Sequence, residues 1–388
     1  MSSPPSEAEA YERALELLRR AAGPQGFVAA LDGPAGYERV WARDGVVCGL
    51  AGVAAGDPAL VEALARTLAT LRDAQGPHGE IPSNVGTAGA SYGTLVGRVD
   101  APLWYALGVA ALRRVDEAEA ARHLSAAVRA LDVVDAWELN GGGLVHVPPG
   151  GFWADEYPLG GYVLAVQLLR LWALRALGEE ERCERLRAIV GRELRLDPGR
   201  RDGLHPAARE QALAAGHAGW AASLDPGGYT FRFDGLAAAL VALLGLEGVD
   251  EAAAGLVQRA EPFGLVPAYD PPVLPGDAGW EALRTARLGA FRNEPWCYHN
   301  GGRWPFVTGI AALGLAACGR EREAATLAAG IDRLNAADGW SFPEFAHGRT
   351  GAPGGARGTA WSAAAAVLAR HAARGDGGAG SALSSPRS

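Results

Sequence analysis

Residues 305–318 read PFVTGIAALGLAAC, and residues 320–335 read REREAATLAAGIDRLN, with a single glycine between them. The first segment is apolar around its whole circumference, which predicts a helix that is buried on most sides. The second segment is charged and rich in Ala and Leu, which predicts an amphipathic helix with one exposed face. Together they predict one helical hairpin with an inner and an outer member.

The same two kinds of segment alternate along the rest of the chain. Charged outer segments pair with apolar inner segments at a spacing of roughly 55–75 residues. Six such pairs predict an all-α fold, an internally repeated (α/α)6 toroid, whereas residues 206–222 do not fit the count. The predicted outer helices span residues 7–22, 58–74, 116–135, 179–194, 248–260 and 320–335, and the predicted inner helices span residues 45–55, 101–113, 159–177, 235–246, 305–318 and 359–373.

The domain organisation follows from the absence of any linker. No Ser/Pro-rich stretch or run of charge divides the 388 residues, so one large repetitive domain over residues 1–374 is expected. Hydrophobic residues make up 49% of the chain, which is enough to supply a large core. Residues 375–388 are rich in Gly, Ser and Ala without a periodic apolar face, which is the composition of a disordered tail.

Charge and composition exclude several classes of function. The formal net charge is −8 and no basic cluster is present, which argues against a nucleic-acid partner. The four cysteines lie far apart without a histidine at ligand spacing, so no metal site and no cofactor is expected. The N-terminus has no apolar signal core, and no segment reaches the roughly 20 apolar residues of a membrane span, which predicts a cytoplasmic protein without a membrane partner. The sequence does not define an oligomeric state.

An aromatic or polar motif stands directly before each predicted inner helix. The N-terminal ends of the inner helices of a toroid point to one face, so six such motifs are expected to converge on one funnel. Aromatic and acidic side chains that converge in a concave mouth are typical of a ligand site. The motifs are Trp41-Ala42-Arg43-Asp44, Arg98-Val99-Asp100, Trp153-Ala154-Asp155-Glu156-Tyr157-Pro158, Phe231-Arg232-Phe233-Asp234, Tyr298-His299-Asn300-Gly301-Gly302-Arg303-Trp304-Pro305 and Thr359-Ala360-Trp361.

Two acids in aromatic surroundings are candidate catalytic residues. Asp100 lies four residues before Trp104, and Glu344 lies within Trp340-Ser341-Phe342-Pro343-Glu344-Phe345. Two such carboxylates are the minimal machinery for glycoside hydrolysis, one as acid and one as base or nucleophile. The structural alternatives are that Asp100 caps a helix with Pro102 near its start, and that Glu344 pairs with Arg349 or Arg357.

The remaining motif residues suit a neutral sugar. Aromatic rings stack on the apolar faces of pyranoses, and charged or amide groups satisfy the hydroxyls. The structural alternatives are packed aromatics and histidine, and local ion pairs within the Arg-Asp motifs; the pair in the motif at 231–234 carries the weakest functional signal. The candidate substrate-binding residues are Trp41, Arg43, Asp44, Glu156, Arg232, His299, Trp304 and Trp361.

These motifs, in this order, resemble the neutral/alkaline invertases. The resemblance rests on Arg43-Asp44, Gly97-Arg98-Val99-Asp100 with Leu103-Trp104, the motif at 298–305, and Phe342-Pro343-Glu344-Phe345. Trp41-Ala42-Arg43-Asp44 and residues 75–82, QGPHGEIP, also resemble bacterial amylo-α-1,6-glucosidases, relatives that share the (α/α)6 barrel.

The resemblance implies an inverting glycoside hydrolase. It assigns Asp100 as the general acid and Glu344 as the general base, with Arg43 and Asp44 gripping hydroxyls of the sugar at the cleavage point. The chain departs from the invertases at Gly160-Gly161, where the family has a carboxylate that Asp155 or Glu156 would have to supply.

Three classes of function therefore remain. The first is hydrolysis of a small α-linked sugar, with sucrose ahead of α-1,6-linked glucosides. The second is sugar epimerisation, which uses the same barrel but depends on histidines, and only His299, His347 and His78 lie near the motifs. The third is a non-catalytic carbohydrate-binding barrel, which would not need both Asp100 and Glu344.

Overall fold

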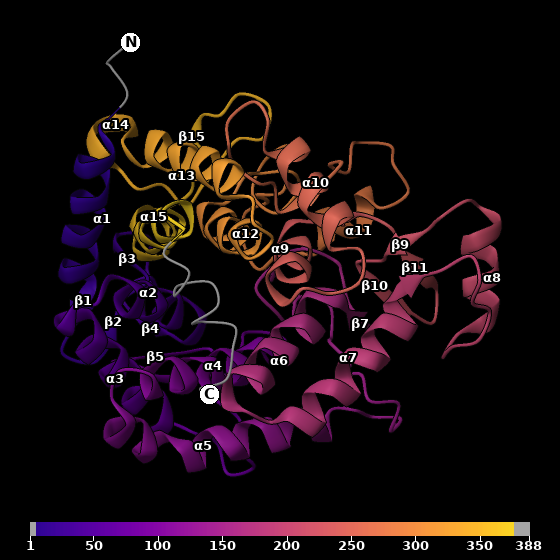
Figure 1. Ribbon diagram of the computed structural model, residues 1–388, viewed down its shortest axis with the longest axis horizontal. Helices are drawn as coiled ribbons and strands as arrows, with labels where there is room; N and C mark the ends of the chain where they lie inside the picture. Colours follow the sequence, from indigo (N-terminus) through magenta and orange to yellow (C-terminus); the bar gives the residue numbers. More distant parts are fainter. Residues whose placement is uncertain (1–4, 376–388) are drawn as a thin grey trace.

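The computed structural model describes residues 5–375, which form an (α/α)6 toroid of six inner and six outer helices (Figure 1). The all-α prediction is confirmed, although short strands join the helices. The inner helices are α2 (Ala42–Ala55), α4 (Asp100–Arg113), α6 (Leu164–Leu177), α9 (Gly235–Leu244), α12 (Pro305–Ala317) and α15 (Ala360–Ala373). The outer helices are α1 (Glu7–Ala21), α3 (Pro58–Asp73), α5 (Glu117–Ala136), α7 (Glu180–Leu194), α10 (Val249–Ala260) and α13 (Glu321–Asn335).

The ring closes through its inner helices. Each inner helix packs against the next in chain order, and the last, α15, packs against the first, α2. The segment that was expected to be buried on most sides behaves accordingly, because every residue of α12 from Pro305 to Leu315 is buried. The neighbouring outer helix α13 begins with exposed charged residues and buries only one side. The predicted tail largely falls on residues 376–388, which lie outside the described residues.

Four of the short strands lead directly into inner helices. Strands β4, β7, β12 and β16 end one residue before α2, α6, α9 and α15 start. Strand β16 pairs with β3 in the antiparallel register Thr359↔Ala30 and Arg357↔Asp32, which joins the last hairpin of the chain to the first. The strands are β1 (Ala22–Gly23), β2 (Gly26–Phe27), β3 (Ala30–Asp32), β4 (Val40–Trp41), β5 (Asn84–Gly86), β6 (Gly89–Ser91), β7 (Tyr162–Val163), β8 (Arg195–Leu196), β9 (Gly219–Trp220), β10 (Ser223–Asp225), β11 (Gly228–Thr230), β12 (Phe233–Asp234), β13 (Tyr269–Asp270), β14 (Phe345–Ala346), β15 (Pro353–Gly354) and β16 (Arg357–Thr359).

Three further helices stand outside the ring. Helix α8 (Pro206–Ala214) and strand β9 lie within residues 206–222, which do not fit the predicted repeat. Helices α11 (Trp280–Thr285) and α14 (Ala337–Trp340) are short segments of the connections before α12 and after α13. Within residues 5–375, no helix combines the length and apolarity needed to cross a membrane.

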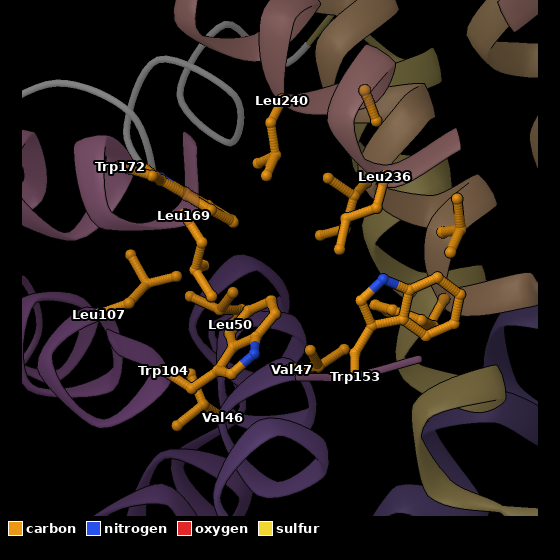
Figure 2. Close-up of a cluster of buried hydrophobic side chains, with 14 of the residues drawn as sticks. Val46, Val47, Leu50, Trp104, Leu107, Trp153, Leu169, Trp172, Leu236 and Leu240 are labelled. Carbon is orange, nitrogen blue, oxygen red and sulfur yellow. The ribbon is translucent and has the colours of Figure 1, made fainter. Parts of the chain in front are cut away.

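Apolar side chains from the inner helices meet within the ring (Figure 2). Trp104 of α4 and Trp172 of α6 are fully buried and meet edge to face, with ring centroids 6.3 Å apart. Val46 and Leu50 of α2 belong to the same cluster. Burial of large aromatic and aliphatic side chains is the main favourable contribution to such a core. The inner helices are therefore held in place by packing, and their N-terminal ends form a rigid support for the motifs.

Candidate active site

A cavity of about 440 Å³ lies where the connections before five of the inner helices converge. Charged groups and aromatic rings line it together, as expected for a site that binds a polar ligand with apolar faces. The lining residues are Ala29, Tyr37, Trp41, Arg43, Asp44, Thr94, Arg98, Trp153, Asp155, Glu156, Leu288, Gly289, Ala290, Arg292, Tyr298, His299, Trp304, Glu344 and Trp361.

The cavity gathers most of the predicted site residues from distant parts of the chain. Of the ten candidates, all but Asp100 and Arg232 line it. Asp100 lies next to Arg43, and Arg232 lines a different cavity. The expectation that the motifs converge therefore holds for five of the six, and the motif at 231–234 belongs elsewhere.

Glu344 is held in one orientation by two donors. The Tyr37 hydroxyl donates to Oε1 at 2.6 Å, and the backbone N–H of Ala356 donates to Oε2 at 3.1 Å. Burial raises the pKa of Glu344, while these hydrogen bonds act in the opposite direction because they favour the charged form. Gly355, at φ +77°, leaves room for this carboxylate, since a Cβ atom there would collide with it. Glu344 is thus fixed as a hydrogen-bond acceptor facing the cavity.

Replacing Tyr37 by Phe tests this role of the hydroxyl. Without the hydrogen bond the pKa of Glu344 rises further, so a reaction that needs the ionised carboxylate loses activity at a higher pH than in the wild type. We expect the acidic limb of the kcat/KM profile to move to higher pH, with activity near neutrality reduced by about tenfold. An unchanged acidic limb would show that Tyr37 does not control the ionisation of Glu344.

Asp100 is the first residue of α4, and its carboxylate is almost completely buried. Arg43 Nη1 lies 3.9 Å from Oδ2, too far for a direct hydrogen bond, and Oδ2 has no hydrogen-bond partner within residues 5–375. Burial raises the pKa of Asp100, and the guanidinium groups of Arg43 and Arg98 partly offset this. Asp100 does not line the cavity, whereas its neighbour Arg43 does.

Arg43 and Asp44 lie side by side in the first turn of α2. Arg43 Nη2 is 3.3 Å from Asp44 Oδ2, and the guanidinium carbon of Arg43 lies 5.0 Å from the ring centroid of Trp361. Both residues line the cavity, and burial raises the pKa of Asp44. Arg43 Nε is buried and has no hydrogen-bond partner within residues 5–375.

The loop before α6 contributes two adjacent carboxylates in different environments. Arg98 Nη2 donates to Asp155 Oδ2 at 2.7 Å, and the Asp155 side chain remains 22% exposed. Arg292 grips Glu156 with two hydrogen bonds, of 2.8 Å to Oε1 and 3.2 Å to Oε2. Bidentate pairs of this kind fix geometry as well as charge. Both carboxylate oxygens of Glu156 are therefore bonded to Arg292, whereas the Asp155 side chain is partly exposed in the cavity.

Aromatic rings form one wall of the cavity. His299 stacks on Trp304 with ring centroids 5.2 Å apart, and Trp153 meets both rings edge-on. Trp361 stacks on Phe306 at 4.8 Å. Burial and the neighbouring cations lower the pKa of His299 well below its usual range, so the imidazole is neutral at neutral pH. Two buried donors or acceptors of this wall, Trp153 Nε1 and His299 Nδ1, have no hydrogen-bond partner among residues 5–375.

A smaller cavity of about 210 Å³ adjoins the first. The two cavities have Thr94, Arg98, Asp155 and Leu288 in common. The smaller one is bounded mainly by the segment around Leu95 and Val96, by Pro149 and Gly150, and by residues 285–288. Asp155 consequently stands where one cavity passes into the other.

Several lining residues were not among the candidates from sequence. Trp153 and Tyr298 belong to quoted motifs but were not candidates, and Asp155 was named only as an alternative to Glu156 for the carboxylate that the invertases have after the motif. Tyr37 and Arg292 belong to none, and they act through contacts with Glu344 and Glu156 that are 307 and 136 residues away in the chain. No local pattern marks either residue, because each is identified only by its partner in space.

Trp361 contributes to both packing and the site, which Trp361→Ala should reveal. The residue is 4% exposed, so we expect a loss of about 3–5 kcal/mol in the free energy of unfolding, measured by urea denaturation. The affinity for substrate should also fall, since Arg43 loses the ring beneath it. Trp361→Phe, which keeps an aromatic ring, is the control and should retain most of both. Unchanged affinity with a large loss of stability would make Trp361 a core residue only.

Comparison with known proteins finds solved structures of the same fold at low identity, whereas no protein-family model and no curated protein matches the chain. The GH63 mannosylglycerate hydrolase from Thermus thermophilus, in complex with Tris and D-glycerate, is 20% identical with a TM-score of 0.64, over 92% of this chain and 99% of its own. A wild-type glycosidase is 17% identical with a TM-score of 0.63, over 95% and 98%. A bacterial glucoamylase in complex with acarbose is 17% identical with a TM-score of 0.62, over 94% of this chain and 55% of its own.

Proposed function

We propose that the protein is an inverting glycoside hydrolase that releases a neutral sugar from a small α-linked substrate. The observation that carries the proposal is the meeting of two cavities at Asp155, the larger of which also holds Glu344. In this arrangement the 440 Å³ cavity binds the sugar whose bond is cleaved, and the 210 Å³ cavity binds the leaving group. The similarity to solved glycosidases of the same fold supports the reaction class.

Glu344 acts as the general base in this proposal. An inverting enzyme needs an ionised carboxylate that removes a proton from water as the water attacks the anomeric carbon. The donors Tyr37 and Ala356 favour the ionised form and orient its oxygens. Arg292 adds a positive charge that acts in the same direction on the pKa of Glu344. The surroundings of Glu344 thus support a base that functions near neutral pH.

Asp155 is the candidate proton donor that the geometry favours over Asp100. A general acid must reach the oxygen of the bond that breaks, and that oxygen lies between the sugar and the leaving group. Asp155 lines both cavities, whereas Asp100 lines neither. The assignment of Asp100 from the sequence remains the alternative, in which the proton would have to pass by Arg43.

The remaining groups would recognise the sugar. Arg43, Asp44 and His299 offer hydrogen-bonding groups to hydroxyls, and Trp41, Trp304 and Trp361 offer ring surfaces to its apolar faces. The neutral imidazole of His299 is suited to hydroxyl recognition and cannot serve as a cation at neutral pH. This single lining histidine also weighs against an epimerase, which requires a histidine acid and base.

The candidate substrates differ mainly in their leaving groups. Sucrose is the first candidate by the resemblance to invertases, and α-1,6-linked glucosides are the second by the resemblance to amylo-α-1,6-glucosidases. The solved relatives named above, a mannosylglycerate hydrolase and a glucoamylase bound to acarbose, extend the candidates to mannosylglycerate and α-linked glucose oligosaccharides. A smaller cavity with an apolar wall, including Leu95, Val96 and Leu288, favours a short leaving group over a long polymer.

Sugar release from a panel of substrates tests the proposal. The panel contains sucrose, maltose, isomaltose, panose, trehalose, mannosylglycerate and α-1,6-branched dextrins, with Glu344→Gln as the blank. Hydrolysis of at least one substrate, with the β-anomer formed first in the NMR spectrum, is expected for inversion of an α-linkage. Release of the α-anomer would contradict inversion. Absence of release from every member, with binding retained, would point to a carbohydrate-binding barrel.

A further inference from the structure

The cavity that contains Arg232 is separate from the proposed active site. It measures about 290 Å³ and shares no lining residue with the two cavities described above. It lies between the start of α9, the outer helix α10 and residues 217–222. Aromatic rings stand between the two sites. Trp153 of the candidate active site stacks on Tyr269 with ring centroids 6.4 Å apart, and Tyr269 is the strand partner of Asp234, which lines the second cavity.

Aromatic side chains make up much of the wall of the second cavity. Phe231 stacks on His217 with ring centroids 4.1 Å apart and planes within 5°. Arg259 lies over the ring of Phe233 at 4.5 Å, and Trp220 donates its indole N–H to the backbone oxygen of Glu247 at 3.0 Å. These contacts hold the rings in fixed orientations, so the cavity offers preformed apolar surfaces.

Asp234 adds an unsatisfied acceptor to this wall. The residue is 4% exposed, and its Oδ1 accepts from the backbone N–H of Ala237 at 3.0 Å, which caps helix α9. Oδ2 has no hydrogen-bond partner among residues 5–375, and burial raises the pKa of Asp234 to about 7. A buried polar atom without a partner is unfavourable, and a hydroxyl donor in the cavity would relieve this cost.

The cavity is lined by two acidic and two basic side chains. Asp234 and Glu251 line it together with Arg232 and Arg259. Arg259 is paired with Asp270 at 3.1 Å, and Arg232 donates to the carbonyl of Pro271. A cationic ligand would meet the two guanidinium groups, and an anionic ligand would meet the two carboxyl groups. The balance favours a neutral ligand that carries hydroxyls.

We propose that the second cavity is a non-catalytic binding site for one neutral hexose unit. The Phe231 and Trp220 rings provide surfaces for the apolar face of the sugar, and Asp234 Oδ2 and Arg232 hydrogen-bond to its hydroxyls. This explains why the motif at 231–234 resembles the site motifs although it lies outside the active-site cavity. The inference does not depend on the reaction proposed above, because it concerns binding alone.

Calorimetric titration of Glu344→Gln with D-glucose, D-mannose and D-galactose tests the site. Glu344→Gln is used so that the catalytic centre cannot turn over any substrate. For at least one hexose we expect two binding events per chain. Adding Phe231→Ala should abolish one event, and adding Asp234→Asn, which keeps the helix cap, should weaken the same event by about tenfold. Tyr92→Ala, which removes an exposed ring outside all three cavities, is the matched control and should leave both events unchanged.

Three results would overturn the inference. These are no binding of any of the three hexoses, an unchanged number of binding events in the Phe231→Ala background, and displacement of the hexose by choline or by inorganic phosphate at lower concentration. The turnover number of Phe231→Ala in an otherwise wild-type chain should match the wild type. If the wild type hydrolyses no substrate of the panel but both hexose-binding events are observed, the proposed reaction is refuted and the second binding site is supported.

Discussion

Glu344→Gln is expected to lower kcat by at least about 10³-fold on any substrate that the protein hydrolyses. The substitution keeps the size of the side chain, but it removes the ability to take a proton from water. The amide oxygen of the variant can still accept one of the two hydrogen bonds that Tyr37 and the backbone of Ala356 donate in the wild type, so the side chain retains at least one of its two supports.

Two controls separate chemistry from folding in this experiment. The melting temperature and substrate affinity of Glu344→Gln should stay close to those of the wild type, because no ring or ion pair is lost. The Tyr37→Phe variant should keep far more activity than Glu344→Gln, because it leaves the carboxylate in place. Turnover of Glu344→Gln within tenfold of the wild type would remove Glu344 from the mechanism.

Asp155→Asn is expected to reduce kcat by about 10²–10⁴-fold on a natural substrate, because the leaving oxygen then departs without a proton. Asp100→Asn should lose much less, since Asp100 lines neither of the adjoining cavities. The pair of variants is well matched, because both replace a buried or half-buried aspartate near an arginine with its amide. A severe defect in Asp100→Asn with near-normal turnover in Asp155→Asn would restore the assignment made from sequence.

A glycosyl fluoride of the same sugar sharpens this test, because fluoride leaves without help from an acid. Asp155→Asn should hydrolyse the fluoride at a rate within about tenfold of the wild type, whereas Glu344→Gln should remain inactive, since the attack of water still needs the base. Equal defects of Asp155→Asn on both substrates would mean that Asp155 positions the sugar and does not supply the proton.

The helices could be predicted from the sequence because inner and outer helices of a toroid are buried to different extents. An inner helix is covered on most sides and an outer helix on one side, so their compositions differ over the full length of each segment, as in residues 305–335. The predicted spans 58–74 and 305–318 agree with α3 and α12 at their first residues, Pro58 and Pro305, and end one residue beyond them. Proline suits the first position of a helix. Segment 206–222 was not assigned, because α8 is an insertion that repeats no other part of the chain.

The residues that line the candidate site could be predicted from the sequence only where they lie in motifs. Arg43, Glu156 and His299 belong to segments that enter inner helices, and the ring brings these segments together. Arg232 lies in an equivalent segment but lines another cavity, because the motif alone does not fix on which side of the Tyr157 and Tyr269 rings a side chain falls. The choice of Asp100 or Asp155 as the general acid likewise depends on which side chain lines the cavity, and no sequence pattern indicates this.

The pairing of β3 with β16 has a consequence for how the protein is made. The ribosome delivers Tyr37 early and Glu344 near the end of the chain, and their hydrogen bond forms only when the last hairpin docks beside the first. A nascent chain that stops before Glu344 also lacks α15, the helix that completes the circle of inner helices between α12 and α2. A chain that stops before Glu344 therefore contains neither the proposed base nor a closed ring of inner helices.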